Sequence, residues 1–468
     1  AHDEFVSDAW DPLSYGQDYD ARRPFFDQLV ELQKNVPHPH RTGVKNTDCD
    51  WTDDWWESKN CHFGRSGYRD ENLSYAYRVA FSKDSVDVTY AFNIEQSYDS
   101  LYNYRGWKLK YCFNTHDCVE SEFLYDCRSC NNCFMSWNLR NKQYCIRNEQ
   151  YTKEEYFKKL KEYNFGSHKT IEKLRAEFWQ HIANDAVHRE NYNTQVTNCH
   201  GNFMDQNKNC INGAFLERSE NCRQVVRGFE QRDCIETVSA ALSERSTRTI
   251  LDQFSYGNTC VMYTTNCRYS FYLDACEDCE YCFGCVGIRK KKYCILNKQY
   301  TEDEYNKLLA RIKADMQKSG EWGKFMPPTM AYGGYNISLA QAMFPLSKES
   351  AIRVGFKWEE TVLPSYENAI ASDDLPDDIA TVPDDITQQR VICKETNLSY
   401  NILPHELEFY RTYTIPLPQR HFDFRTFERY KPMALMFRPQ RGTCYYCKAE
   451  IEHYYDPQLG YQKIACIL

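Results

Sequence analysis

The chain has 468 residues, 42% of them apolar, which is enough for several hydrophobic cores rather than one. Its net charge of −9 argues against broad binding to phosphate backbones, because such binding needs a concentration of Lys and Arg. No run of about 18 apolar residues occurs, so we expect no membrane-spanning helix. The 23 cysteines are the most unusual feature of the composition, and thiol ladders, metal ligands and disulfides are the possible explanations.

The chain begins with an acidic and aromatic lead-in, residues 1–45. Within it, residues 25–32 carry apolar side chains at helical spacing. Pro24 precedes them and fits the first turn of a helix, where its missing N–H costs nothing.

Two stretches that follow are copies of one unit. KQYCIRNEQYTKEEY (142–156) recurs as KKYCILNKQYTEDEY (291–305) at a 149-residue offset. The same offset relates five cysteines of one copy to five of the other: Cys118, Cys127, Cys130, Cys133 and Cys145 match Cys267, Cys276, Cys279, Cys282 and Cys294. We therefore predict duplicated units at 46–156 and 195–317.

A shorter period lies inside each copy. Phe92, Phe113 and Phe134 recur at a constant 21-residue step, in segments rich in Tyr, Phe, Val and Cys. This pattern predicts a mainly β protein with helical inserts, in which each copy is a short parallel β-solenoid of 21-residue turns. Cysteine and aromatic side chains would then stack in ladders at the strand spacing. An antiparallel β domain with a chance aromatic period is the alternative.

Helices are expected after each copy. Thr152 with Glu155, and Thr301 with Glu304, have the spacing of a capping box. The first opens a helical linker, 157–194, which we expect to close the end of the first solenoid and to expose His181 and His188 on one helix face. The next segment, 318–387, reads as irregular and ends in an extended acidic linker, 363–387.

The C-terminal module, 388–468, carries the best metal motif. Cys444 and Cys447 form a CxxC pair, and Cys466 follows after 18 intervening residues. In a four-cysteine zinc ribbon the last ligand would fall one position past Leu468, so we expect His453 to supply the fourth ligand or the site to be open. A hairpin with free thiols is the alternative.

Earlier in this module, Cys393 begins a second, degenerate ribbon pattern. It matches the first ligand of the pattern CxxCG, E..FY, P..C..CR, while Thr396, His421 and Phe424 occupy the other three ligand positions. We expect this ribbon to have kept its shape and lost its metal, with hydrophobic contacts in its place.

The Cys-x2-Cys-x2-Cys runs have three open interpretations. We favour buried core thiols, because free cysteine packs as a small hydrophobe, over a zinc or other soft-metal site and over disulfides. These runs are the second choice for metal ligands: Cys127, Cys130, Cys133, Cys276, Cys279, Cys282 and Cys285. Core thiols favour an intracellular, reducing compartment.

Four segments together resemble a family of cysteine-rich repeat proteins with zinc-ribbon-like modules from environmental small-genome bacteria. They are SDAWDPLSYGQDYD (7–20), FFDQLVEL (25–32), CxxCFGCVGIRKKKYCILNKQYTEDEY (279–305) and ELEFYRTYTIPLP (406–418). The resemblance implies zinc binding and a modular architecture, and it brings no reaction. Family members tend to carry a further ribbon before the SDAWDP segment, so we expect trimmed chain ends or a member reduced to a scaffold.

We predict a non-enzymatic scaffold or protein-interaction component that binds zinc in its C-terminal module. Five tryptophans are candidates for contact with a protein partner or a larger assembly: Trp51, Trp55, Trp56, Trp107 and Trp137. One alternative is an enzyme that acts on carbohydrate or nucleic acid in a solenoid groove. Another is a nucleic-acid-associated zinc protein that uses the basic run 289–292, which we regard as a solvated corner.

Overall fold

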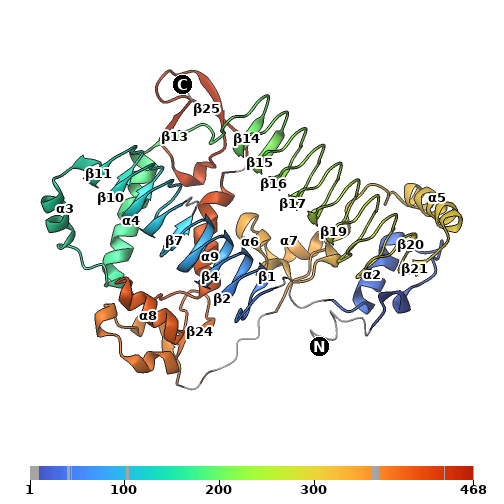
Figure 1. Ribbon diagram of the computed structural model, residues 1–468, viewed down its shortest axis with the longest axis horizontal. Helices are drawn as coiled ribbons and strands as arrows, with labels where there is room; N and C mark the ends of the chain where they lie inside the picture. The colour runs from blue at the N-terminus through green and yellow to red at the C-terminus, as the bar shows by residue number, and fades with distance from the viewer. Residues whose placement is uncertain are drawn as a thin grey trace.

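The computed structural model describes residues 10–38, 43, 45–101, 105–360, 366, 368–436 and 438–466. The protein is mainly β with helical inserts, and its sheets are largely parallel, as expected. Figure 1 shows two long ladders of strands that begin near the middle of the molecule and run outward in opposite directions. Part of the predicted lead-in, residues 1–9, 39–42 and 44, lies outside the described residues.

The first ladder, which we call unit 1, forms a single sheet of 12 strands among the described residues. Successive paired strands follow one another at a 12-residue step, as in Asp53 with Arg65 and Trp107 with Val119. The strands are β1 (Asp53–Trp56), β2 (Lys59–His62), β3 (Arg65–Tyr68), β4 (Glu71–Ser74), β5 (Tyr77–Ala80), β6 (Lys83–Phe92), β7 (Tyr98–Leu101), β8 (Trp107–Lys110), β9 (Val119–Tyr125), β10 (Asn131–Trp137), β11 (Gln143–Ile146) and β12 (Glu149–Gln150).

The second ladder, unit 2, repeats this arrangement. Its first bridges, Thr194 with Asp205 and Thr197 with Lys208, have an 11-residue step. From Gly201 paired with Gly213 onward the 12-residue step applies, and isolated parallel bridges carry it on to Phe283 paired with Ile295. The strands are β14 (His200–Asp205), β15 (Ile211–Glu217), β16 (Val226–Phe229), β17 (Val238–Ala241), β18 (Ile250–Gln253), β19 (Met262–Thr265), β20 (Cys294–Ile295) and β21 (Lys298–Gln299).

The expected 21-residue turn is wrong, because the elementary repeat is a triplet. Every third residue from Lys45 to Tyr144, where described, has a positive φ, and every third residue faces inward. Four triplets make one 12-residue turn, so each residue pairs with the residue 12 positions further along the chain. Phe92, Phe113 and Phe134 share a position within the triplet because 21 is also a multiple of three. They do not stack on one another, because Phe92 pairs with Ala80, Phe113 with Tyr125 and Phe134 with Ile146.

The inward rows consist mostly of small side chains, and many of the cysteines and serines among them hydrogen-bond to backbone groups. The thiol of Cys112 contacts the carbonyl oxygens of Lys110 at 3.3 Å and Ser121 at 3.7 Å, and other inward cysteines repeat this pattern. Inward serines can instead accept hydrogen bonds from the backbone. The hydroxyl oxygen of Ser255 accepts a hydrogen bond from the backbone N–H of Cys267, one turn further on, at 3.2 Å. The cysteines are therefore core residues with a weak hydrogen-bonding role.

A large side chain in this narrow interior needs glycine beside it. Trp55 is fully buried, and a Cβ atom on either Gly64 or Gly67 would lie 2.2 Å from its indole ring. Trp55 is thus a core residue and not the contact residue that the sequence suggested. Trp51, by contrast, is 78% exposed.

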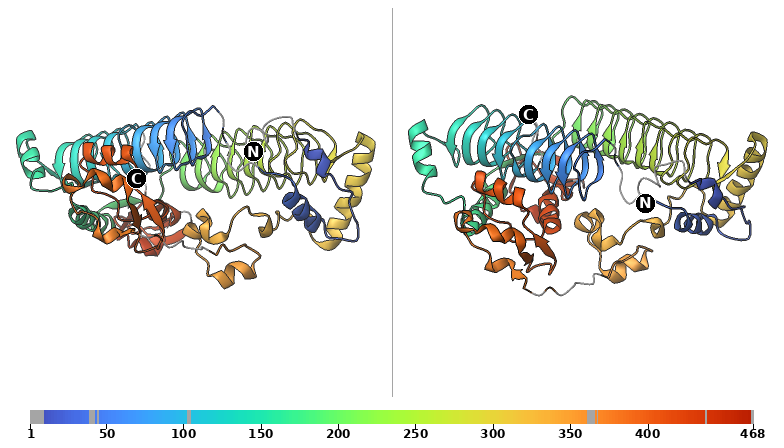
Figure 2. Two further views of the ribbon diagram at one scale, coloured as in Figure 1. Left: turned by 90° about the horizontal axis from the view of Figure 1, so that it is seen from below. Right: turned by 60° about the horizontal axis from the view of Figure 1, so that its bottom comes forward.

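Both units end in the same way, at opposite outer ends of the molecule (Figure 2). A tight antiparallel hairpin, β11–β12 or β20–β21, turns the chain, and the side chains of Asn148 and Asn297 pair with the backbone of the preceding turn. A helix with the predicted capping box follows each hairpin: α3 (Lys153–Leu160) and α5 (Glu302–Ser319). These devices cover the final edge of each ladder.

The other helices pack along the units. In α2 (Phe25–Asn35), which is longer than predicted, the ring of Phe25 lies 5.0 Å from that of Phe283 in unit 2. The remaining α-helices are α4 (His168–Asn184), α6 (Leu339–Met343), α7 (Lys348–Arg353), α8 (Pro404–Thr412) and α9 (Phe422–Ala434). The 3-10 helices are η1 (Pro12–Tyr15), η2 (Pro328–Met330), η3 (Tyr335–Ile337), η4 (Ser372–Asp374), η5 (Ile379–Thr381), η6 (Asp384–Gln388) and η7 (Pro457–Leu459).

The acidic segment is packed rather than extended where it is described. Leu375, Ile379 and Ile386 are buried in the core that also covers unit 1. Asp377 accepts hydrogen bonds from the backbone N–H of Lys169 and the hydroxyl of Ser167, at the start of α4. The apolar residues between the aspartate pairs therefore anchor the segment, while the aspartates cap a helix. Residues 363–365 and 367 lie outside the described residues.

The C-terminal module docks on unit 1 through buried charges. Arg425 and Arg429 of α9 both pair with Asp87 of β6, at 3.0 Å and 3.2 Å. The strands of the module are β23 (Arg390–Ile392), β24 (Ser399–Asn401), β25 (Gln440–Thr443), β26 (Glu450–His453) and β27 (Lys463–Ala465), and β22 (Ile370–Ala371) of the preceding segment pairs with β23. No described helix is both long and apolar enough to span a membrane.

Candidate metal centre

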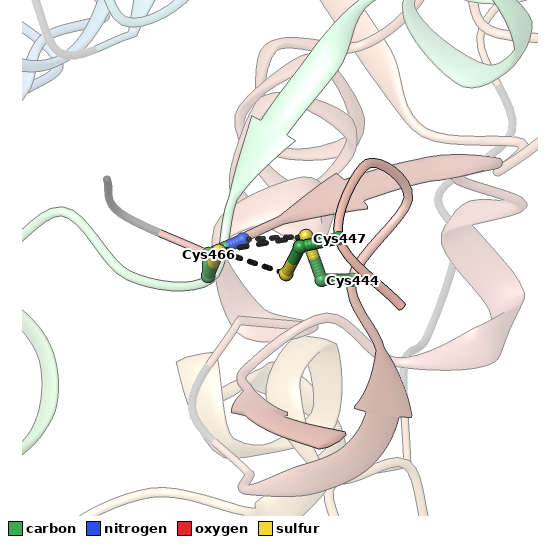
Figure 3. A group of neighbouring side chains, drawn as sticks. All are labelled: Cys444, Cys447 and Cys466. Carbon is green, nitrogen blue, oxygen red and sulfur yellow. Dashed lines mark hydrogen bonds between the residues drawn. The ribbon is translucent and has the colours of Figure 1, made fainter. Parts of the chain in front are cut away.

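Three cysteines of the C-terminal module converge, as the sequence predicts. Cys444 follows β25, Cys447 lies in the turn before β26, and Cys466 comes directly after β27. Figure 3 shows their sulfur atoms facing one another. The Sγ atom of Cys466 lies 3.5 Å from that of Cys444 and 3.7 Å from that of Cys447.

These distances suit a shared metal ion better than a disulfide. A disulfide needs sulfur atoms about 2.05 Å apart. A tetrahedral zinc ion with Zn–S bonds of about 2.3 Å places its sulfur ligands about 3.8 Å from one another. The two distances from Cys466 therefore match the edges of a tetrahedron around one ion, and all three sulfur atoms lie within 4.8 Å of one another.

Backbone groups favour the thiolate form at this site. The N–H of Cys466 points at the Sγ atom of Cys444 at 3.4 Å. Backbone N–H groups of Cys466 and Cys447 lower the pKa of Cys444 to about 6. Because metals bind the thiolate, this environment prepares Cys444 as a ligand at neutral pH.

His453, the expected fourth ligand, does not join the group. It ends β26, and its Nδ1 atom accepts a hydrogen bond from the backbone N–H of Tyr455 at 3.3 Å. Within the part of the chain that the structure describes, the cysteine group has no fourth His, Cys, Asp or Glu ligand. Ile467 and Leu468, which precede the position expected for the last ligand of a second CxxC motif, lie outside the described residues.

The site lies where the two units join. Strand β27 pairs in parallel with β13 (Val187–Arg189), the short strand that lies between α4 and the first strand of unit 2, β14. The backbone N–H of Gln462 donates to the carbonyl of Ala183 at 2.9 Å. In Figure 1 the red C-terminal hairpin stands over this junction. A metal at Cys466 would therefore restrain the strand that holds the connection.

A buried histidine at this junction escaped the sequence analysis. His188 was expected to be exposed on a helix, but α4 ends at Asn184 and His188 lies in β13 with no exposed surface. Its Nδ1 atom accepts from the hydroxyl of Tyr125 at 2.7 Å, Nε2 donates to the carbonyl of Ile182 at 2.9 Å, and Tyr461 stacks on its ring. Burial lowers the pKa of His188 to about 3, so the ring is neutral. No local pattern reveals this cluster, because its members come from three distant segments.

The degenerate ribbon keeps the hairpin shape without the sulfur ligands. Cys393, between β23 and β24, is fully buried, and its thiol points to Glu395 at 3.4 Å. His421 caps α9 by accepting the N–H of Asp423 at 3.2 Å. The described residues do not bring Cys393 and His421 into a metal-binding group.

The Cys-x2-Cys-x2-Cys runs also form no such group among the described residues. All seven of these cysteines are buried, and they belong to two separate hydrophobic clusters inside the units. Each occupies an inward triplet position, so consecutive cysteines line different sides of the same turn. The core interpretation explains their spacing of three.

The basic run 289–292 is partly compensated by acidic side chains of the neighbouring turn. Arg289 lies 3.9 Å from Glu277, and Lys292 pairs with Glu280. These two ion pairs reduce the positive charge that the run presents to a nucleic acid.

Comparison with known proteins found no matching family model and no matching curated protein. The geometry described above therefore carries the functional argument alone.

Proposed function

We propose that this protein is a non-enzymatic scaffold built from two β-solenoid units of 12-residue turns, with one structural zinc ion that stabilises their junction. The single observation that carries this proposal is the group of three cysteine sulfurs next to β27, the strand that pairs with the connection between the units. A protein partner or a larger assembly would use the rigid frame.

Zinc is the metal that suits this donor set best. Thiolates select soft or borderline ions, and the spacing of the three sulfurs fits tetrahedral coordination. Cys444, Cys447 and Cys466 would hold the ion, and a water or a group from a partner would complete its coordination. A bound ion here would contribute folding energy to the hairpin β25–β26, whose strands bury little surface of their own.

The contacts around the site support a structural role. Besides the pairing of β27 with β13, the hydroxyl of Tyr455 donates to the carbonyl of Arg189, and Asn202 of unit 2 donates to the carbonyl of Met436. The module thus contacts both the connection between the units and the first turns of unit 2. An ion that orders Cys466 would limit movement between the units.

A row of stacked tyrosines on the outside of unit 2 supports the interaction role. Tyr269, Tyr281 and Tyr293 of unit 2 stack at centroid distances of 5.2 Å and 5.6 Å along the outside of successive turns. Phe254 is 54% exposed on the same unit. Rigid aromatic side chains of this kind are typical of protein interfaces, so we propose a protein partner for this face.

The decisive experiment combines metal counting with hydrogen exchange. We expect one zinc ion per chain by mass spectrometry, lost after treatment with a strong chelator. Chelation should speed amide exchange in 187–189 and 463–466 and leave exchange in β9 and β10 unchanged. Absence of zinc, or removal of zinc without change at the junction, would contradict the proposal.

Cysteine chemistry gives a second measurement. All 23 cysteines are free thiols in the structure. We propose that the protein works in a reducing, intracellular compartment, and a thiol count on protein purified without reductant tests this. A count below about half of the cysteines would argue for disulfides and for an oxidising compartment.

A further inference from the structure

A partly open groove of about 620 Å³ runs along the outside of unit 1, beside the C-terminal module. Outward side chains from the turns that hold β7, β8, β9 and β10 line it, together with Phe157 of α3, the end of α8 and residues 412–415. The amine of Lys110 donates to the carbonyl of Tyr413 at 3.2 Å, so unit 1 and the module are in contact within the groove. The volume lies in the range of ligand-binding sites.

Four polar side chains form a regularly spaced row in this groove. They occupy the same position of four successive 12-residue turns: Gln96, Lys108, Glu120 and Asn132. Paired strands of a sheet lie about 4.8 Å apart, so the row repeats at that interval. Regular spacing of this kind suits an extended ligand that is built from repeating units.

The charged side chains that line the groove balance one another. Two lysines, Lys108 and Lys110, stand against two glutamates, Glu120 and Glu122. Lys110 pairs with Glu122 at 2.6 Å, and the amine of Lys108 lies 4.3 Å from the centre of the Trp107 ring. A lining without net charge gives little attraction for a strongly charged ligand, so a neutral ligand is favoured.

Hydrogen-bond acceptors of the groove are left without donors. The Oε1 atom of Gln96 and the Oε2 atom of Glu122 have no hydrogen-bond partner. Glu120 is exposed and forms no ion pair with any described residue. Carboxylate and amide oxygens can be satisfied only by O–H or N–H donors, which a ligand in the groove would supply.

Aromatic rings border the same acceptors. Phe157 is 40% exposed, and the rings of Phe409 and Tyr413 lie 4.7 Å apart at the end of α8. The faces of such rings take up apolar C–H surface. The groove therefore combines acceptors for hydrogen bonds with apolar faces.

From this arrangement we propose that the groove on unit 1 binds a neutral oligosaccharide. A sugar unit carries several hydroxyl donors for the free acceptors, C–H faces for the aromatic rings and no net charge, and a chain of such units repeats along the row. A peptide offers only one backbone N–H per residue, so the density of acceptors favours the sugar.

Calorimetric titration of the full chain tests the proposal. The probes are linear hexasaccharides of glucose, mannose, xylose and N-acetylglucosamine, with a hexamer of galacturonic acid as the charged comparison. We expect at least one neutral probe to bind with a dissociation constant of about 1 mM or lower. The charged hexamer should bind at least about tenfold more weakly than that probe.

Substitutions locate the binding. Glu120→Gln removes a charged acceptor and should weaken binding about tenfold. Phe157→Ala removes an aromatic face and should weaken binding about fivefold. Both side chains are exposed, so both variants should fold. Glu244→Gln is the matched control, because Glu244 is an exposed glutamate of unit 2, and this change should leave the affinity unchanged.

Hydrogen exchange places the bound probe independently. The hexasaccharide that binds should slow amide exchange in 107–110, 119–122 and 412–415 and leave exchange in 250–265 unchanged. Absence of binding by every neutral probe would overturn the proposal, and so would tighter binding of the charged hexamer. Binding that both groove variants retain at full affinity would also overturn it.

Discussion

The two hairpins of the C-terminal module fold in the same way and are stabilised differently. In each, the N–H of the first cysteine donates to the carbonyl five residues on, and the residue four positions on is left-handed: Cys393 with Asn397, and Cys444 with Lys448. The hairpin β23–β24 buries Val391 and Cys393 in the main core, whereas β25 is exposed or half-buried along its length. One turn geometry therefore serves with sulfur ligands or with hydrophobic packing.

The two hairpins differ at the second ligand position of the ribbon motif. Thr396 replaces the second cysteine of the motif in the packed hairpin, and Cys447 keeps it in the exposed one. A hairpin that is buried on one side can lose its metal, because core contacts replace the ion. A hairpin that buries little apolar surface has no core contacts that could replace the metal ion.

The largest expected effect is on the exposed hairpin. Cys447→Ser should reduce zinc from about one ion per chain to about none, because two thiolates hold zinc far less tightly than three. The measurement is metal content by mass spectrometry, with exchange at 463–466 as the structural readout. Cys393→Ser is the matched control and should leave the zinc content unchanged. Equal loss in both variants would mean that the hairpins do not differ as described.

The second effect concerns Glu406 of α8, the helix after the packed hairpin. Its side chain is buried, accepts the N–H of Leu403 at 2.8 Å, and burial raises its pKa to about 7. The folded state therefore favours the protonated acid. Its stabilising contribution is present below pH 4.5 and is lost as the pH rises through about 7, a change of about 3 kcal/mol.

Urea unfolding at about pH 5 and about pH 8 measures this dependence. Glu406→Gln should remove most of it, because the amide does not titrate. Glu408→Gln, on the same helix, is the control and should keep the wild-type dependence. A Glu406→Gln variant with an unchanged pH profile would place the titration elsewhere.

A smaller effect is expected from the core of the packed hairpin. Val391→Ala should destabilise the protein by about 2 kcal/mol, because it leaves a small cavity at a fully buried position. The zinc content should stay at the wild-type value. Loss of zinc in this variant would show that the two hairpins are coupled.

The smallest effect is expected when the missing cysteine is restored in the packed hairpin. Thr396→Cys restores a CxxC pair in the packed hairpin, but His421 caps α9 and Phe424 offers no ligand. We expect no additional zinc and little change in unfolding free energy. A second zinc ion per chain would show that the degenerate ribbon still has a usable ligand set.

Residue spacing along the chain predicted three features of the structure. The 149-residue duplication, the capping boxes of Thr152 and Thr301, and the convergence of Cys444, Cys447 and Cys466 all follow from residues close in sequence or repeated at a fixed offset. The predicted 21-residue turn is wrong, because in a triplet repeat aromatic residues can recur at any spacing that is a multiple of three. The length of the turn, 12 residues, is set by which strands pair, and the spacing of the aromatic residues does not reveal it.

The sequence by itself determined that this protein is a duplicated, mainly β chain with core cysteines and a three-cysteine group near its end. The tertiary structure alone decided that this group lies beside the junction of the units, that His188 is buried there, and that Asp87 has two arginine partners. The physical reason is the separation along the chain of the residues that interact. Turns, caps and inward rows depend on neighbours along the chain, whereas pairing between β13 and β27 or between β6 and α9 joins segments that are distant in the sequence.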